Sequence, residues 1–251
     1  MRAGAWIRRW GPALAALAVP VTGTMYWTGF RSPEPVRPAV HSLAPLALEV
    51  VAVPAGLHRV GGRPEWREIK TGAFQIGRTE VTVRQYCDVL NRSGAGGRET
   101  PQITGARGAW TPREGCADQA VAWVTAREAE AFCDWLSGAA GVRVRLPDAD
   151  EWEIAARAGG RGERADGWRG NADRPTRAPA ADTPPENAWG LRGIGGGVFE
   201  WCREGDARIA RDSAWTEPTD AFEPLHRHWS PPPGYHDADT GFRVRVDVPP
   251  R

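Results

Sequence analysis

Apolar side chains recur every three or four residues in three stretches of the chain, and this spacing predicts three amphipathic helices. The first covers residues 83–91 and has Thr82 as its candidate N-cap. The second follows Thr125, and Glu128 three positions later completes a capping-box pattern. The third covers residues 148–158.

Polar stretches rich in Gly, Arg, Thr and Pro separate these segments. Residues 92–118 and 159–186 have this composition, which predicts long surface loops. Apolar and charged residues alternate over residues 240–246, which indicates a strand near the C-terminus. The helices and the strand together predict one α+β domain.

A long uncharged run near the N-terminus changes this picture. Residues 10–30 carry no charge, and as a helix they measure roughly 31 Å, close to a hydrocarbon core of about 30 Å. Arginines precede the run and predict a cytoplasmic N-terminus. We therefore expect residues 1–30 to be a single-pass anchor in the inner membrane, with the rest of the chain in the periplasm. A cleaved signal peptide is the alternative, because residues 16–18 resemble a cleavage site.

Composition fits a membrane-anchored globular protein. Residues 31–45 are rich in proline and predict a linker, which leaves residues 46–251 for the domain. Hydrophobic residues make up 41% of the chain and charged residues 25%, as in ordinary globular proteins. The formal net charge is +1 and no basic stripe is present, which argues against nucleic-acid binding.

Three motifs resemble the signature of the formylglycine-generating-enzyme (sulfatase-modifying factor) family. They lie at residues 145–159, 187–191 and 196–201. The resemblance extends over residues 48–246 and implies a variant of the C-type-lectin-like fold, with much irregular structure. It also implies short strands, which lie at residues 48–56, 74–82 and 143–147 and in the segment 240–246.

The resemblance fails at the residues that would carry the family's reaction. Catalytic members use two cysteines and copper after a strand that corresponds to residues 211–215. An ungapped alignment on Trp215 puts Glu217 and Phe222 at these two positions, and no cysteine follows Cys202. Neither replacement can act as a thiolate nucleophile or a soft metal ligand. We therefore predict a member of the family that is not an enzyme.

The family resemblance also implies a calcium loop, and this chain retains only part of it. Asn187 is present, but Gly193 stands at the aspartate position and Gly197 at a later asparagine. Calcium prefers several oxygen ligands, and here an anionic one is missing. We expect no cofactor, with calcium at Asn187 as the alternative; otherwise Asn187 caps a turn.

Histidines near the C-terminus offer a second possible metal site. His226, His228 and His236 lie close to Asp237 and Asp239, a set that suits iron or zinc in principle. We expect no metal here and interpret them as solvated histidines of a Pro-rich loop, with the metal site as the alternative. Pairing cannot be assigned for the chain's four cysteines: Cys87, Cys116, Cys133 and Cys202.

These features predict a non-catalytic, membrane-anchored scaffold or accessory subunit of a larger membrane complex, for example a respiratory or photosynthetic one. Its partners are other subunits of that complex, and residues 10–30 contact the lipid bilayer. Trp110, Trp168 and Trp229 lie in the predicted loops and are candidate partner-binding anchors. The alternatives are a lectin-like ligand-binding module and a family enzyme with altered metal chemistry.

Overall fold

The computed structural model describes residues 38–62, 65–160, 179–183, 186–194, 196–212, 214–215 and 228–248. Within these ranges there are three helices, α1 (Val83–Ser93), α2 (Ala126–Ala140) and α3 (Ala149–Arg157). The strands are β1 (Val40–Leu43), β2 (Leu48–Val53), β3 (Gly56–Val60), β4 (Arg67–Thr71), β5 (Phe74–Gly77), β6 (Ile103–Thr104), β7 (Thr111–Pro112), β8 (Val144–Arg145), β9 (Phe199–Glu204), β10 (Ala207–Arg211), β11 (His228–Trp229), β12 (Thr240–Gly241) and β13 (Arg245–Asp247).

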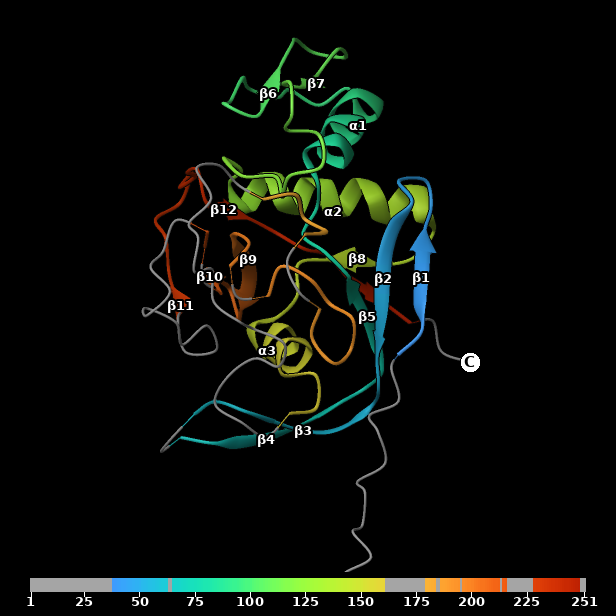
Figure 1. The fold of residues 1–251 in the computed structure, drawn as a ribbon, viewed down its shortest axis with the longest axis vertical. Helices are drawn as coiled ribbons and strands as arrows, with labels where there is room; N and C mark the ends of the chain where they lie inside the picture. Colours follow the sequence, from blue (N-terminus) through green and yellow to red (C-terminus); the bar gives the residue numbers. More distant parts are fainter. Residues whose placement is uncertain are drawn as a thin grey trace, which may run out of the picture. The chain divides into compact units, whose positions relative to one another are not determined.

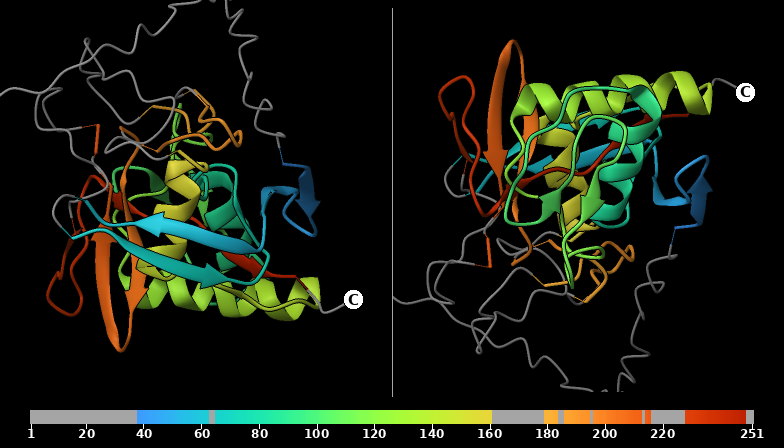
Figure 2. Two further views of the ribbon diagram at one scale, coloured as in Figure 1. Left: turned by 90° about the horizontal axis from the view of Figure 1, so that it is seen from below. Right: turned by 90° about the horizontal axis from the view of Figure 1, so that it is seen from above.

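The described strands form two main sheets and two separate hairpins. One sheet has the order β1-β2-β5-β13-β8 and the other β11-β10-β9-β12, while β3–β4 and β6–β7 pair by themselves (Figure 1). Helix α1 packs on α2, α2 contacts β8, and α3 contacts β3 and β9 (Figure 2). Strand β13 lies between β5 and β8, so the end of the domain completes a sheet that its beginning starts.

The three predicted helices are confirmed, and local side chains fix where they start. The Thr82 hydroxyl accepts a hydrogen bond from the backbone of Gln85 at 3.2 Å. Thr125 and Glu128 form the predicted capping box, with Thr125 N donating to the Glu128 carboxylate at 2.7 Å. Helix α2 ends at Gly141, whose φ of 69° is easily reached without a Cβ.

The predicted C-terminal strand is in fact two strands in different sheets. Strand β12 pairs parallel with β9, and β13 pairs antiparallel with β5. Residues 240–244, which comprise β12 and the link to β13, are all buried, and Arg243 is one of them. The alternation of apolar and charged residues therefore does not mark two faces of one strand. A buried charged residue produced the misleading pattern.

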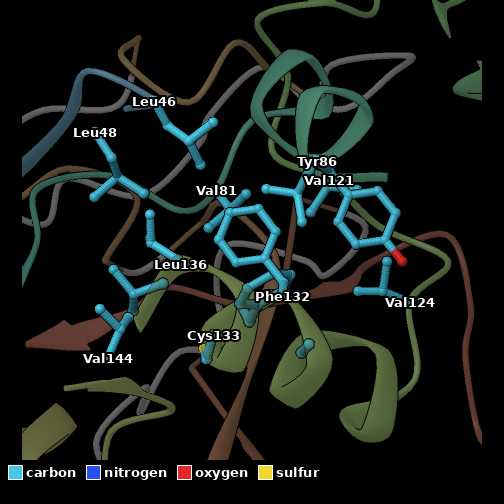
Figure 3. Close-up of a cluster of buried hydrophobic side chains, with 14 of the residues drawn as sticks. Leu46, Leu48, Val81, Tyr86, Val121, Val124, Phe132, Cys133, Leu136 and Val144 are labelled. Atoms are coloured by element: carbon cyan, nitrogen blue, oxygen red, sulfur yellow. The ribbon is translucent and has the colours of Figure 1, made fainter. Parts of the chain in front are cut away.

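Buried side chains form two large clusters. In the first, the Phe132 ring of α2 stacks on Tyr86 of α1, with ring centroids 6.2 Å apart (Figure 3). The Phe132 ring also meets Phe242 edge-to-face at 5.2 Å. The second surrounds Trp152 of α3, which is fully buried. The three helices and the strands that pack against them thus contribute mainly to the core.

The region predicted as a surface loop at residues 92–118 contributes to the first cluster. It contains the β6–β7 hairpin, and Ile103 and Trp110 are both buried. Asn91 fixes the backbone of Trp110 through hydrogen bonds to its N–H and its carbonyl, at 2.7 and 2.8 Å. The polar composition of this segment hid two apolar side chains that pack inward.

The domain also begins earlier than predicted. Strand β1 lies inside the range predicted as a linker, residues 31–45, and pairs antiparallel with β2 from Val40 to Leu43. Most of the prolines that indicated a linker precede this strand. In the part of the chain that the structure describes, no helix is long and apolar enough to cross a membrane. The predicted span at residues 10–30 lies outside that part and stays a prediction.

Candidate functional site

Of the three tryptophans predicted to bind a partner, the structure describes two, and one of these two lies at the surface. Trp229, in β11, has 37% of its surface exposed and packs edge-to-face on Tyr235, with ring centroids 4.7 Å apart. Trp110 is only 6% exposed, so the prediction that it is an accessible anchor is wrong. Its ring lies beside Gly97 and belongs to the same buried cluster as Leu90. Trp168 lies outside the described residues.

The segment after Trp229 forms a rigid turn. Tyr235 donates its backbone N–H to the carbonyl of Pro232 at 3.0 Å, and Gly234 has a φ of 82°. Proline in the second position and glycine in the third are the residues of a type II turn. Because Pro233 has little freedom to lose, this turn presents its surface at a small entropic cost.

Acidic groups behind the turn hold it in place. The Tyr235 hydroxyl donates to Asp237, and the backbone N–H of Asp239 points to the same carboxylate at 3.4 Å. Partial burial works against ionisation of Asp237, but the hydrogen bonds its carboxylate accepts lower its pKa overall. Burial and the neighbouring Asp237 raise the pKa of Tyr235, so the phenol stays a hydrogen-bond donor.

The weak histidine candidate for a metal site is only partly described. His236 is exposed, and its Nδ1 lies 2.9 Å from the carbonyl of Gly234. His226 and the side chain of His228 lie outside the described residues. Among the residues that are described, no three His, Cys, Asp or Glu side chains come together in a way that could hold a metal ion.

A cleft of about 910 Å³ opens beside the turn. It lies between the start of α2, the β9–β10 turn and residues 230–235. Two ion pairs line it, Arg98 with Glu128 at 3.0 Å and Arg208 with Glu130 at 2.5 Å. Two more charged residues in its lining are exposed: Arg127 and Asp206. Apolar contacts come from the prolines and the Tyr235 ring, so the cleft has the mixed lining of a binding site.

The backbone near this cleft is strained. Trp123, just before α2, has a φ of 61°, which is rare for a bulky residue. Its N–H donates to the carbonyl of Asp237 at 2.7 Å, and its own carbonyl accepts a hydrogen bond from Arg98. Two hydrogen bonds thus hold this conformation, and one of them comes from Arg98, which lines the cleft; strained backbone of this kind is common at functional sites.

The calcium candidate Asn187 is buried and fully engaged. Its side-chain oxygen accepts from the backbone N–H groups of Trp189 and Leu191, at 3.0 and 3.1 Å. Its nitrogen donates to the carbonyls of Ala155 and Ala156, at 2.9 and 3.3 Å. The amide therefore shapes a turn, as the alternative interpretation predicted, and has no group turned toward a cation.

A buried carboxylate lies near the same loop. Glu80 is 1% exposed, and neither of its carboxylate oxygens has a hydrogen-bond partner among the described residues. Burial raises its pKa to about 7; Arg243 opposes this shift and Glu200 adds to it. The sequence does not point to Glu80, because nothing in its surroundings along the chain marks it as buried.

Three of the four thiols, those of Cys87, Cys133 and Cys202, are poorly suited to redox chemistry. Cys87, Cys133 and Cys202 are buried free cysteines, and Cys116 is a half-buried one. Burial raises the pKa of Cys87 to about 11 and shifts Cys133 and Cys202 upward as well. Reactive cysteines need a lowered pKa and access to solvent. Positions 217 and 222 lie outside the described residues.

Comparison with known proteins identifies the family. The family described as the Sulfatase-modifying factor enzyme 1-like domain matches residues 40–248. The chain belongs to the sulfatase-modifying factor family. This sulfatase-modifying factor domain is 29% identical over 125 residues to the Bos taurus protein named "Inactive C-alpha-formylglycine-generating enzyme 2", a match that covers 40% of each chain. The chain thus spans less than half the length of the curated relatives named inactive formylglycine-generating enzyme 2.

Solved structures establish the fold. PvdO from Pseudomonas aeruginosa superposes with a TM-score of 0.71 at 20% identity, covering 84% of this chain and 99% of PvdO. Treponema denticola variable protein 1 gives a TM-score of 0.63 at 18% identity, covering 83% and 98%. The mixed α and β architecture of the sulfatase-modifying factor domain therefore recurs in both proteins.

Proposed function

We propose that this sulfatase-modifying factor domain is a non-catalytic scaffold or accessory subunit of a larger membrane complex, anchored by residues 10–30 and placed on the periplasmic side. The exposed Trp229 carries the proposal. It projects from a short edge strand next to a rigid turn and a cleft. Large aromatic side chains on rigid supports dominate binding energy when a partner buries them.

Two further observations support a role without catalysis. An ungapped alignment on Trp215 places Glu217 and Phe222 at the positions of the family's catalytic cysteines. The thiols at Cys87, Cys133 and Cys202 are buried with raised pKa values. A relative that carries the word inactive in its name agrees with this interpretation.

The second candidate function is binding of a small ligand or peptide in the cleft. The volume of about 910 Å³ favours it, since ligand pockets commonly measure about 300–1,000 Å³. An enzyme with altered metal chemistry gains no support from the described residues, which bring no three metal-ligating side chains together.

The test is extraction of the tagged full chain from its own membrane in a mild detergent, followed by size separation and mass spectrometry. The proposal expects the chain in the membrane fraction and in a complex with stoichiometric partner subunits. Recovery of the chain alone in several mild detergents would contradict a scaffold role and favour the ligand-binding alternative. Release from the membrane by an alkaline wash would contradict the anchor.

A further inference from the structure

The two glycines that replace the family's calcium ligands face one side chain. A Cβ atom built on Gly193 or on Gly197 would overlap the carboxylate of Glu80, well inside van der Waals contact. Glu80 comes from the segment between β5 and α1, far from both glycines in sequence. The carboxylate of Glu80, where the structure places it, and side chains at positions 193 and 197 therefore compete for one volume.

A positive charge already occupies this part of the core. The guanidinium of Arg243 is fully buried and lies 3.9 Å from the Glu80 carboxylate. It donates to the backbone carbonyls of Gly77 at 3.0 Å and of Arg192 at 2.9 Å, and to both oxygens of Glu200 at 2.6 Å. The guanidinium thus holds together β5, the segment that contains Arg192 and Gly193, and β9. It does so through contacts to oxygen atoms, as a bound cation would.

A divalent cation does not fit beside these groups. It would need several oxygen ligands, but Asn187 is engaged with the backbone and Glu200 is engaged with Arg243. Of the three side chains Asn187, Glu200 and Glu80, only Glu80 is not engaged in this way, and the fixed guanidinium would repel a second positive charge at this distance.

We infer that Glu80 is an internal replacement for the missing ligand side chains: its carboxyl group fills the volume of positions 193 and 197, and Arg243 supplies the positive charge, so the loop holds its shape without a divalent cation. The identities of residues 80, 193 and 197 are then coupled through space. Such coupling is expected of an internal replacement. It is not expected of a calcium site that has only lost its ligands, where residues 80, 193 and 197 would act independently.

A double-mutant cycle on the full chain tests the coupling. Position 197 is suitable because its backbone does not need a positive φ, whereas Gly193 has a φ of 77° and any substitution there is strained. Gly197→Ala should lower Tm on the order of 5 °C, because the new methyl group meets the carboxylate. In the Glu80→Ala background the same substitution should lower Tm much less. A residual effect is expected, since the carbonyl of Gly193 lies 2.9 Å from the new Cβ.

Calcium provides the second measurement. Wild type and Glu80→Gln, a variant of the same shape, should each give the same Tm in EDTA and in millimolar calcium. If Gly197→Ala fails to fold while the double variant folds, the coupling is confirmed in its strongest form. Additive effects of the two substitutions would overturn the inference. So would a calcium-dependent rise in the Tm of the wild type that is lost in Glu80→Gln.

Discussion

Arg243 and Glu200 form a fully buried ion pair in which Nε and Nη2 of the guanidinium each donate to a carboxylate oxygen at 2.6 Å. The indole N–H of Trp152 donates to the same carboxylate at 2.8 Å. Glu200 therefore connects α3, β9 and the segment before β13 in the centre of the fold.

Removal of the Glu200 carboxylate should lower the free energy of unfolding far more than removal of a carboxylate at the surface. Glu200→Ala leaves a buried guanidinium without its main partner and should cost about 3–5 kcal/mol of unfolding free energy. The control is Glu130→Ala, which breaks the half-exposed pair with Arg208 and should cost about 1 kcal/mol or less. Urea unfolding followed by tryptophan fluorescence measures both, and equal losses would show that the Arg243 pair is not central.

Stability should also depend on pH through Glu80. The pKa of Glu80 is about 7 in the folded chain and near 4.5 in the unfolded chain. Between pH 4.5 and about 7, the folded state therefore keeps a proton that the unfolded state has released. The contribution of this proton to the free energy of unfolding is full below pH 4.5 and is lost as the pH rises through about 7. Arg243 and Glu200 are the charged groups that act on it.

The difference between wild type and Glu80→Gln isolates this contribution. Glutamine has no proton to release, so the wild type should lose stability relative to the variant as pH rises from about 4.5 to about 7. A difference curve that stays flat over this range would mean that Glu80 titrates normally in the folded chain.

Trp110 and Trp229 should respond differently to the same substitution. Trp110→Ala removes a core side chain and should cost about 3–5 kcal/mol. Trp229→Ala mainly loses its edge-to-face contact with Tyr235, which is worth about 0.5–1.5 kcal/mol. Thermal unfolding of the two variants measures both losses of stability. A Trp110→Ala protein as stable as Trp229→Ala would contradict the burial of Trp110.

The contrast between these tryptophans shows where sequence reasoning reached its limit. The cap at Thr125 depends on Glu128 three positions later, so a local pattern was enough to place α2. The burial of Trp110 depends on Leu90 and Gly97 across a loop, and no local pattern marks such a contact. Polar surroundings in the sequence therefore suggested exposure for a residue that is buried.

Arg243 illustrates the same limit for charge. An arginine next to apolar residues at the end of a chain suggested a strand with one solvated face. Its burial requires Glu200, Glu80 and several carbonyls from distant segments to converge on it. The family resemblance predicted the fold and drew attention to the two positions where catalytic members carry cysteines. The contacts between Glu80 and Arg243 could be found only in the structure.

The purified chain should not convert the cysteine of a sulfatase-type peptide to formylglycine, with or without copper. The thiols at Cys87, Cys133 and Cys202 are buried and hard to ionise, and no cysteine follows Cys202. Mass spectrometry of the peptide measures the outcome, with a catalytically active family member as the positive control. A mass loss that corresponds to formylglycine would show that the chain is an enzyme.

Co-purification with Trp229→Ala tests the central claim, that this domain acts through a contact surface, most directly. The matched control is Leu57→Ala, which removes an apolar side chain that is 64% exposed on the separate β3–β4 hairpin. The full chain with Leu57→Ala should retain its partner subunits at wild-type stoichiometry after extraction in mild detergent, whereas Trp229→Ala should lose them while remaining folded. Retention of the partners at wild-type stoichiometry by a folded Trp229→Ala protein would contradict the account.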